Sequence, residues 1–303
     1  MVDLLGPGAA VTAAPGPVVG RAREVELLGA ALESGTHVLL EGPPGTGKST
    51  LLRAVAAAQH VPFVLVEGNA ELTPGRMVGH FDPAQVLSQG YLPSVFVDGP
   101  LLEAMRTGAL LYVEEVNRVP EETLNVLLTV MSEGEIAVPR LGRVAADPGF
   151  RLVAAMNPYD AVGTARISSA LYDRSCRLTM GYQDADDERA IVELRAPAVP
   201  DAWLALAVEL VRRTREHPDV RVGSSVRGAI DVVRLATSLS RRRDVPLEDW
   251  DCGLDAALVA LSGRVRLQES CSRSPETIVR ELYDAVFGPR PEPGEDGGPP
   301  GGA

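Results

Sequence analysis

A glycine-rich run that ends in the sequence's one lysine is the first part of the chain with the residues for chemistry. The run matches the spacing G-x-x-x-x-G-K-[ST] at every required position. Glycines allow backbone N–H groups to turn towards a phosphate, the lysine adds a positive charge, and the last hydroxyl is a ligand that Mg²⁺ accepts. The pattern predicts a nucleotide-binding loop made by Gly42, Pro43, Pro44, Gly45, Thr46, Gly47, Lys48 and Ser49, with Thr50 next to it.

Lys48 is the only lysine in the sequence. The chain has 29 basic residues, and all of the others are arginine. Codon usage in a GC-rich genome explains an excess of arginine, as it explains the many Ala, Gly and Pro residues. It does not explain why one lysine remains, whereas a position that needs a compact ammonium group does. We therefore predict that Lys48 reaches the β and γ phosphates.

Two adjacent carboxylates follow an apolar run, Leu110–Val113. Hydrolysis of a nucleotide needs acidic groups at the end of a neighbouring strand to support Mg²⁺ and to orient water. We predict that Glu114 supports Mg²⁺ together with Ser49, and that Glu115 polarises the attacking water. The alternative is a pair of surface glutamates at a strand end, which the phosphate loop disfavours.

Short apolar runs alternate with helical stretches, as in a parallel sheet covered by helices. The fold class expected is an α/β P-loop NTPase sandwich with a five-stranded parallel sheet, followed by a smaller all-α lid domain. The domain limits expected are a disordered segment 1–17, a nucleotide-binding domain 18–184, a lid 185–287 and a disordered Gly/Pro-rich tail 288–303. The expected strands are Val38–Leu40, Phe63–Val66, Leu110–Val113, Leu152–Met156 and Cys176–Met180, and the expected lid helices are Trp203–Arg215, Val226–Ser240, Leu254–Arg266 and Pro275–Phe287. Asp184, Asp186 and Asp187 are the residues expected to cap the first helix after the sheet.

The composition narrows the classes of partner. Apolar residues make up 45% and charged residues 23%, as in a globular protein, and the net charge of −12 disfavours nucleic acid and membrane surfaces. No apolar run reaches the length of a membrane span, and the first residues lack a secretory signal. The three cysteines are far apart and suggest neither a disulfide framework nor a metal site. We expect a cytoplasmic protein.

With these motifs in place, the chain resembles the AAA+ ATPases, and within them the MoxR branch beside the magnesium-chelatase ATPase subunits. The resemblance runs from Val19 to about Phe287. It rests on Val19-Gly20-Arg21 with Glu24, the phosphate loop, Asp98-Gly99-Pro100-Leu101 leading to Glu114-Glu115-Val116-Asn117-Arg118, and Gly163-Thr164 leading through Ala170 to Asp173-Arg174.

The resemblance implies three further site residues. Asn157, at the end of the strand that begins at Leu152, corresponds to a polar sensor that contacts the γ phosphate and the lytic water. Arg174 corresponds to a finger that reaches the nucleotide of a neighbouring subunit. Arg227, at the start of a lid helix, corresponds to a second sensor of nucleotide state.

The resemblance also implies an assembly and partners. Relatives form hexameric rings, act on a protein client as chaperone-like machines, and commonly work with a separate protein bearing a von Willebrand A domain, for example in metalloenzyme maturation. ATP and Mg²⁺ are the expected substrate and cofactor. The inserts Leu72–Pro100 and Glu135–Phe150 either contact the client or have an ordinary packing role.

One departure from the family pattern leaves alternatives open. The family has Asp-Glu where this chain has Glu114-Glu115, and the extra methylene moves the first carboxylate outwards. A nucleotide-gated assembly scaffold with little turnover is therefore one alternative. A DNA-associated motor is another, although the acidic charge balance disfavours it.

Overall fold

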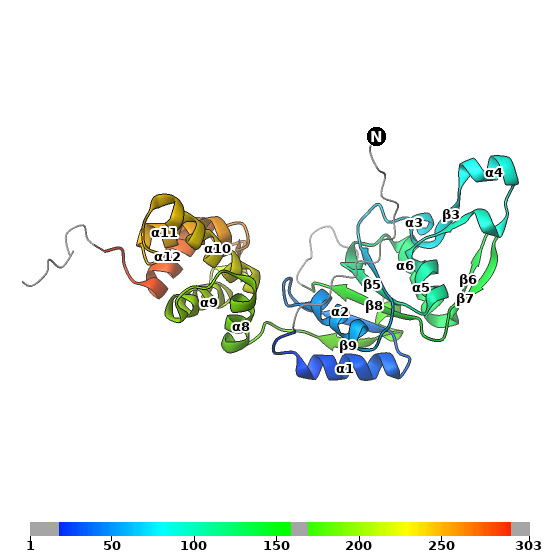
Figure 1. Ribbon diagram of the computed structural model, residues 1–303, viewed down its shortest axis with the longest axis horizontal. Helices are drawn as coiled ribbons and strands as arrows, with labels where there is room; N and C mark the ends of the chain where they lie inside the picture. Colours follow the sequence, from blue (N-terminus) through cyan, green and yellow to red (C-terminus); the bar gives the residue numbers. More distant parts are fainter. Residues whose placement is uncertain (1–17, 159–168, 292–303) are drawn as a thin grey trace, which may run out of the picture. The chain divides into compact units, whose positions relative to one another are not determined.

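Five parallel strands form the central sheet, in the spatial order β2-β5-β8-β1-β9 (Figure 1). Their bounds are β1 Val38–Glu41, β2 Phe63–Glu67, β5 Leu110–Glu114, β8 Arg151–Met156 and β9 Cys176–Thr179. Each lies within one residue, at either end, of the range expected from the sequence. The predicted α/β fold class, with its five-stranded parallel sheet, is confirmed.

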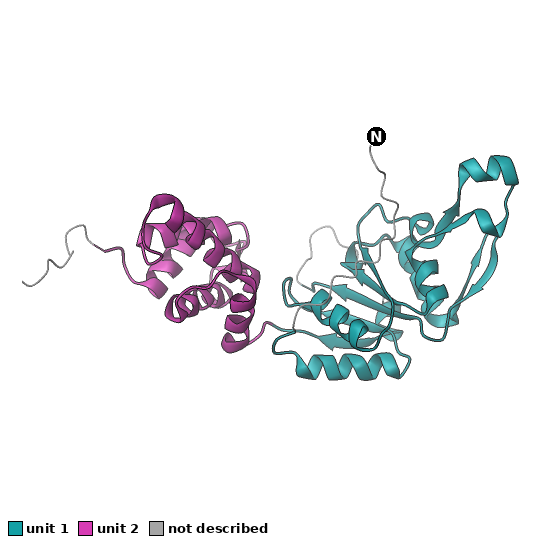
Figure 2. Cartoon of the chain, viewed as in Figure 1, with its two compact units in different colours: residues 1–181 teal, residues 182–303 magenta. Residues whose placement is uncertain are grey.

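The computed structural model describes residues 18–158 and 169–291. The chain divides into two compact units, residues 1–181 and 182–303 (Figure 2). The predicted disordered segment 1–17 and the part of the predicted tail from 292 to 303 lie outside the described residues. Gly163 and Thr164, which contribute to the family resemblance, lie outside them as well.

The two faces of the sheet are buried by different helices. Because side chains alternate along a strand, Val38 and Leu40 face one way and Leu39 faces the other. The first face packs against α1 (Ala22–Glu33) and α2 (Lys48–Ala58). The second face packs against α3 (Pro74–Val78), α5 (Pro100–Thr107), α6 (Glu121–Glu133) and α7 (Ser169–Asp173). Both faces of the three central strands, β5, β8 and β1, are therefore covered, which explains why these strands are apolar, whereas the edge strands β2 and β9 are partly exposed.

Two hairpins extend beyond the sheet in the first unit (Figure 1). One is formed by β3 (Gly79–Phe81) and β4 (Phe96–Asp98), with α4 (Pro83–Gln89) and the short 3-10 helix η1 (Pro93–Val95) between them. The other is formed by β6 (Glu135–Val138) and β7 (Gly142–Ala145). The Arg140 guanidinium lies 3.7 Å from the centre of the Tyr91 ring and joins the two hairpins. We call this pair of hairpins the arm.

The second unit is helical. It contains α8 (Ala185–Arg195), α9 (Asp201–Glu216), α10 (Val226–Arg243), α11 (Trp250–Leu261) and α12 (Pro275–Phe287), with a short ribbon of β10 (Val220–Val222) and β11 (Arg266–Leu267). The Asp184 carboxylate accepts the N–H of Asp187 at 2.8 Å, so Asp184 is the cap among the three predicted residues, and Asp186 and Asp187 lie in the first turn of α8. The predicted helix Leu254–Arg266 is wrong at both ends, because Asp249 caps this helix earlier and the chain turns at Gly263 to form the ribbon. Within the described residues, no helix is long and apolar enough to cross a membrane.

Candidate functional site

The phosphate loop joins the end of β1 to the start of α2. Gly45 and Gly47 have φ angles of +76° and +87°, a region that side-chain-bearing residues rarely adopt. At Gly42 a Cβ atom would lie 2.2 Å from the carbonyl oxygen of Met180, so only glycine fits there. The loop thus has the glycines at positions where the backbone requires them, and it places its N–H groups before the N-terminus of α2, where an anion is favoured.

Lys48 turns its ammonium group back into this loop. Its Nζ donates hydrogen bonds to the carbonyl oxygens of Gly42 at 2.8 Å and Pro43 at 2.9 Å. The Thr46 hydroxyl donates to the same Pro43 oxygen at 3.0 Å. The positive charge is therefore held within the turn that would surround a phosphate.

Ser49 and Glu114 are far apart in the sequence, and the fold brings them together. The Ser49 hydroxyl donates to Oε1 of Glu114 at 2.9 Å and lies 3.3 Å from the buried Tyr112 hydroxyl. Burial raises the pKa of Tyr112 well above its ordinary value, so this hydroxyl stays neutral. A hydroxyl and a carboxylate oxygen form the kind of oxygen ligand set that Mg²⁺ prefers. The residues present therefore fit the predicted ion, and the extra methylene of Glu114 does not take its carboxylate away from Ser49.

Glu115 has an unusual backbone conformation. Its φ is +52° and its ψ is 45°, the left-handed region, which costs a residue with a side chain about 1–2 kcal/mol. Gly68, just after β2, makes room for this turn, since a Cβ there would lie 2.4 Å from the Glu115 carbonyl oxygen. The Glu115 carboxylate is half-buried and pairs with Arg118 Nη1 at 2.9 Å. Such strain is often found at functional sites.

Asn157 follows the last residue of β8, which is the strand between β1 and β5. The Met156 carbonyl accepts the N–H of Gly42 at 3.2 Å, and Met156 is the register partner of Glu41. Asn157 is half-buried and lies one residue beyond this pair. The strand ends that carry the phosphate loop, the acidic pair and Asn157 are thus neighbours at the carboxyl edge of one sheet, where α/β proteins bind ligands.

Arg174 follows α7 and lies at the surface of the first unit. Its Nε donates to the Ser132 hydroxyl at 2.5 Å and its Nη1 donates to the Ala170 carbonyl at 3.1 Å. Its one described ion pair is a long one to Asp173, at 3.9 Å. None of these contacts is in the phosphate loop, and the side chain is partly exposed. The Arg174 guanidinium is therefore held by α6 and α7 rather than by the phosphate loop.

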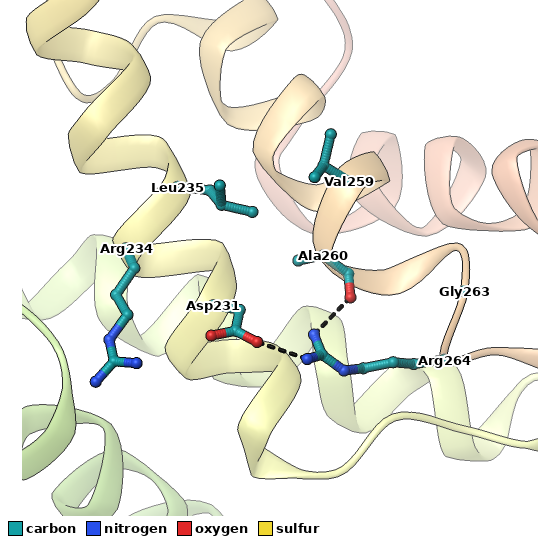
Figure 3. A pocket seen from close by; sticks show the side chains of 7 residues that line it. All are labelled: Asp231, Arg234, Leu235, Val259, Ala260, Gly263 and Arg264. Carbon is teal, nitrogen blue, oxygen red and sulfur yellow. Dashed lines mark hydrogen bonds and ion pairs between the residues drawn. The ribbon is translucent and has the colours of Figure 1, made fainter. Parts of the chain in front are cut away.

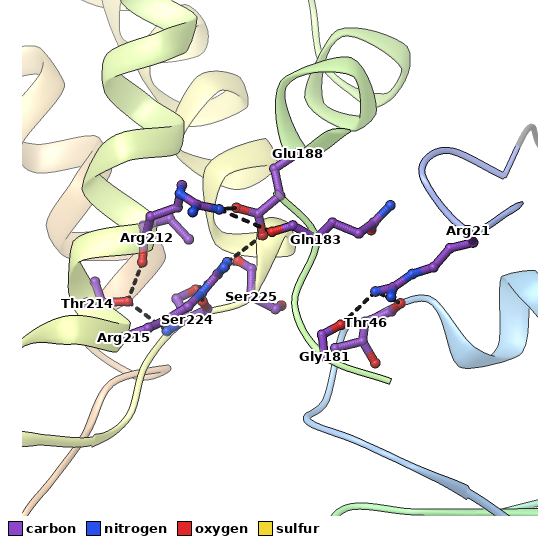
Figure 4. A network of polar contacts seen from close by, with 11 residues as sticks. Arg21, Thr46, Gly181, Gln183, Glu188, Arg212, Thr214, Arg215, Ser224 and Ser225 are labelled. Atoms are coloured by element: carbon purple, nitrogen blue, oxygen red, sulfur yellow. Dashed lines mark hydrogen bonds and ion pairs between the residues drawn. The ribbon is translucent and has the colours of Figure 1, made fainter. Parts of the chain in front are cut away.

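Arg21 makes contacts that the sequence did not predict (Figure 4). Its side chain is buried, and Nη2 donates to the carbonyl oxygens of Thr46 at 3.1 Å and Gly181 at 2.7 Å. Nη1 pairs with Glu24 at 2.7 Å. This arginine therefore fixes the phosphate loop to the last residue of the first unit. The only sequence signal was its place in the Val-Gly-Arg segment.

Arg227 belongs to the second unit, where it is the second residue of α10 and is exposed. The turn before it is held by a buried charge cluster (Figure 4). Arg215 donates to the Ser224 carbonyl at 2.6 Å and to Glu188 at 2.7 Å, and Arg212 donates to Glu188 at 3.3 Å. The start of α10, and with it Arg227, is thus rigidly placed within its own unit.

The second unit also has a pocket of about 450 Å³ between α10 and α11 (Figure 3). It is lined by Asp231, Arg234, Leu235, Val259, Ala260, Gly263 and Arg264. Arg264 pairs with Asp231 at 2.6 Å, so two of the charged side chains that line the pocket neutralise each other. None of the residues that the sequence singled out lies there, and the candidate site remains the carboxyl edge of the sheet.

The strand order and the phosphate loop define a P-loop ATPase of the AAA class. Residues 37–175 match the family described as the AAA domain of the dynein-related subfamily. The gas vesicle ATPase GvpN1 of Halobacterium salinarum is 31% identical over 78% of this chain and 72% of its own length. The uncharacterized protein YeaC of Bacillus subtilis is 29% identical over 89% of this chain and 90% of its own length.

Among solved structures, the RuvB Holliday junction branch migration motor of Thermotoga maritima has the same fold. It is 20% identical with a TM-score of 0.52, over 80% of this chain and 70% of that chain. The chain belongs to the AAA+ ATPases, in the dynein-related subfamily. It is therefore an ATPase, and ATP is its substrate.

Proposed function

We propose that this chain is a MoxR-like AAA+ ATPase that hydrolyses ATP with Mg²⁺ in a ring and uses the cycle to remodel a protein client. The observation that carries the catalytic part is the hydrogen bond of 2.9 Å between Ser49 and Glu114 beside the phosphate loop. It joins the two residues that the sequence assigned to the ion. Mg²⁺, when bound, neutralises phosphate charge and fixes the orientation of the triphosphate.

The chain's own residues divide the remaining work. Backbone N–H groups of the loop and the N-terminus of α2 bind the phosphates, while Lys48 moves its Nζ from the loop carbonyls to the β and γ phosphates. Glu115 polarises the attacking water, and its left-handed backbone directs the carboxylate independently of Glu114. Asn157 contacts the γ phosphate and this water. Chemistry of this kind depends on positioning and electrostatics.

The contacts of Arg174 support the proposed ring. The AAA+ fold favours oligomers, and a partly exposed arginine, held by Ser132 rather than by the phosphate loop, is suited to completing a neighbour's site. A positive charge supplied there stabilises the transition state of phosphoryl transfer. We propose a homo-oligomer, a hexamer by resemblance, in which Arg227 reports the nucleotide state to the lid.

The arm is the proposed contact with the client. In α4 no residue is buried, and Leu87 is 91% exposed. Phe81 packs edge-to-face on Tyr91 and Phe96, with ring centres 5.2 and 4.9 Å apart, so the arm is internally braced. A rigid arm with an exposed apolar tip can transmit motion to a protein. A separate protein with a von Willebrand A domain is proposed as a partner by resemblance alone.

A scaffold with little turnover is the second candidate, and Glu114 is the residue on which it rests. The reach of Glu114 to Ser49 speaks against it, because the longer side chain still arrives at the predicted ion site. Steady phosphate release at saturating Mg·ATP supports the motor. Tight binding with no release supports the scaffold.

The experiment that tests the proposal is phosphate release per subunit, measured across protein concentration. We expect the rate per subunit to rise as subunits assemble, and we expect the Arg174→Ala variant to stay at the low rate at every concentration. Arg213→Ala is the matched control, since Arg213 forms an exposed pair with Glu209 on α9. A rate per subunit that is independent of concentration and of Arg174 would reject the shared site.

A further inference from the structure

A buried carboxylate lies directly before the phosphate loop. Glu41 is the last residue of β1 and is 2% exposed. The Tyr172 hydroxyl donates to its Oε1 at 2.7 Å, and Arg177 Nε donates to its Oε2. A carboxylate taken out of water needs such partners, and removing one of them leaves a buried charge poorly satisfied. Nothing in the hydrolysis described above uses this group.

The two partners of Glu41 lie on either side of Arg174 in the sequence. Tyr172 belongs to α7, just before Arg174, and Arg177 belongs to β9, just after it. The register of β1 and β9 places Arg177 opposite Leu39 and Thr179 opposite Glu41, so Arg177 and Glu41 share one face of the sheet. One carboxylate therefore holds both flanks of the arginine.

Other contacts in the described part of the chain also hold α7 and Arg174 in place. Leu171 buries the inner side of α7 in the core, and Ser132 on α6 accepts the Nε of Arg174. α7 has only five residues, too few for a stable helix on its own. Its position, and that of Arg174, depends on these tertiary contacts.

Glu41 is also tied to the nucleotide site through the next residue. The N–H of Gly42 donates to the Met156 carbonyl. The Gly42 carbonyl accepts a hydrogen bond from Lys48 Nζ at 2.8 Å. A phosphate that draws Lys48 away changes the contacts of the residue next to Glu41. Phosphate binding in the loop and the contacts that position α7 therefore both act on the backbone of Glu41 and Gly42.

We propose that Glu41 is a positioning residue that couples the phosphate loop of one subunit to the Arg174 which that subunit presents to its neighbour. The inference rests on the proposed trans role of Arg174. It assigns to Tyr172 and Arg177 the role of transmitting the state of the loop, so that loss of the Tyr172 hydroxyl weakens the finger and not the ATP site of the same chain.

Mixed assemblies test this. Glu115→Gln subunits keep Arg174 but cannot turn over, and Arg174→Ala subunits keep the catalytic glutamate but lack the finger. A mixture restores hydrolysis at sites where a finger donor meets a finger acceptor. Tyr172→Phe is then added either to the donor or to the acceptor, and phosphate release of the two mixtures is compared.

We expect Tyr172→Phe in the donor to lower the restored rate about tenfold, as for the loss of one hydrogen bond to a charged group, and in the acceptor to leave it unchanged. Tyr283→Phe, the same change in the core of the second unit, is the control in both positions and should have no effect on the restored rate. Equal losses from donor and acceptor, or no loss from either, would overturn the inference while the proposed function stands. No restored rate in the unmodified mixture would overturn the trans finger and, with it, this inference.

Discussion

The carboxyl edge of the sheet and the interior of the second unit both hold charged side chains, but in opposite ways. At the edge, Glu115 is half-buried and lies on a strained backbone, and Lys48 and Ser49 contact groups that a ligand could replace. In the second unit, Glu188 is 2% exposed and is fully engaged by Arg212 and Arg215. The first arrangement is open to exchange of partners, and the second is closed.

This difference indicates which charged residues serve function and which serve stability. Substitutions of Lys48, Ser49 or Glu115 should change catalysis or binding with little loss of stability, because these side chains are partly exposed. Glu41 lies at the same edge but is buried and engaged by Tyr172 and Arg177, so it resembles the closed cluster instead. Substitutions in the closed cluster should lower stability, because they leave buried charge unpaired. The predictions below test this separation.

The largest effect is expected from Glu115→Gln. Removing the group that polarises water should lower ATP turnover by at least about 100-fold. Nucleotide affinity should stay close to that of the parent protein, since the phosphate loop is intact. Phosphate release and a nucleotide titration on the same preparation measure the two. An unchanged rate would remove Glu115 from the mechanism.

The closed cluster gives the next largest effect. Glu188→Ala leaves two partly buried arginines without their carboxylate and should lower the free energy of unfolding by about 3 kcal/mol. Glu209→Ala is the matched control, because Glu209 forms an exposed pair on a helix, worth about 0.5 kcal/mol or less. Chemical denaturation of both variants measures the difference. Equal losses would contradict the contrast drawn between open and closed charges.

The buried His37 should make the stability of the first unit depend on pH. Burial and the nearby Arg151 lower its pKa from 6.5 to about 4, and its Nδ1 accepts the N–H of Leu152 at 2.9 Å, which only the neutral ring can do. The unfolded chain therefore binds more protons between these pKa values. The stability that this group contributes is complete above pH 6.5 and is lost as the pH falls towards 4, by about 3 kcal/mol.

The check is the unfolding free energy of the parent and of His37→Gln across this range. The free energy of unfolding of the parent should fall relative to that of the variant as the pH falls from 7 to 4.5. Parallel curves would show that His37 is not held neutral by the fold.

The smallest effect concerns the strain at Glu115. Glu115→Gly relieves the left-handed backbone and should raise the free energy of unfolding by about 0.5–1 kcal/mol, although turnover is lost. Glu114→Gly, at the regular end of β5, should be destabilising instead. Thermal melts of the two variants compare them. A loss of stability in Glu115→Gly would show that the backbone there is not strained.

Much of this architecture could be predicted from the sequence, for physical reasons. The three central strands of the sheet, β5, β8 and β1, are apolar runs, because both of their faces are buried. The phosphate loop could be predicted because its glycines are demanded by backbone geometry at Gly42, Gly45 and Gly47. The spacing of those residues is therefore visible without coordinates.

The contacts made by Arg21 and Glu41 could not be predicted in the same way. Arg21 reaches Gly181, which is 160 residues away, and Glu41 meets Tyr172, which is 131 residues away. No local pattern encodes such pairs, since they depend on which strands become neighbours. The helix predicted over Leu254–Arg266 differs from the observed α11, Trp250–Leu261. The helical spacing of apolar residues continues beyond Leu261, but the chain turns at Gly263 and the helix ends there.

The central claim is that Lys48 and the loop around it bind the triphosphate. A calorimetric titration of ATP in the presence of Mg²⁺, into the parent protein and into Lys48→Ala, tests it most directly. We predict saturable binding by the parent and affinity at least about 100-fold weaker in the variant, because a charge-assisted contact to phosphate is lost. No binding by the parent, or equal binding by both proteins, would contradict the account.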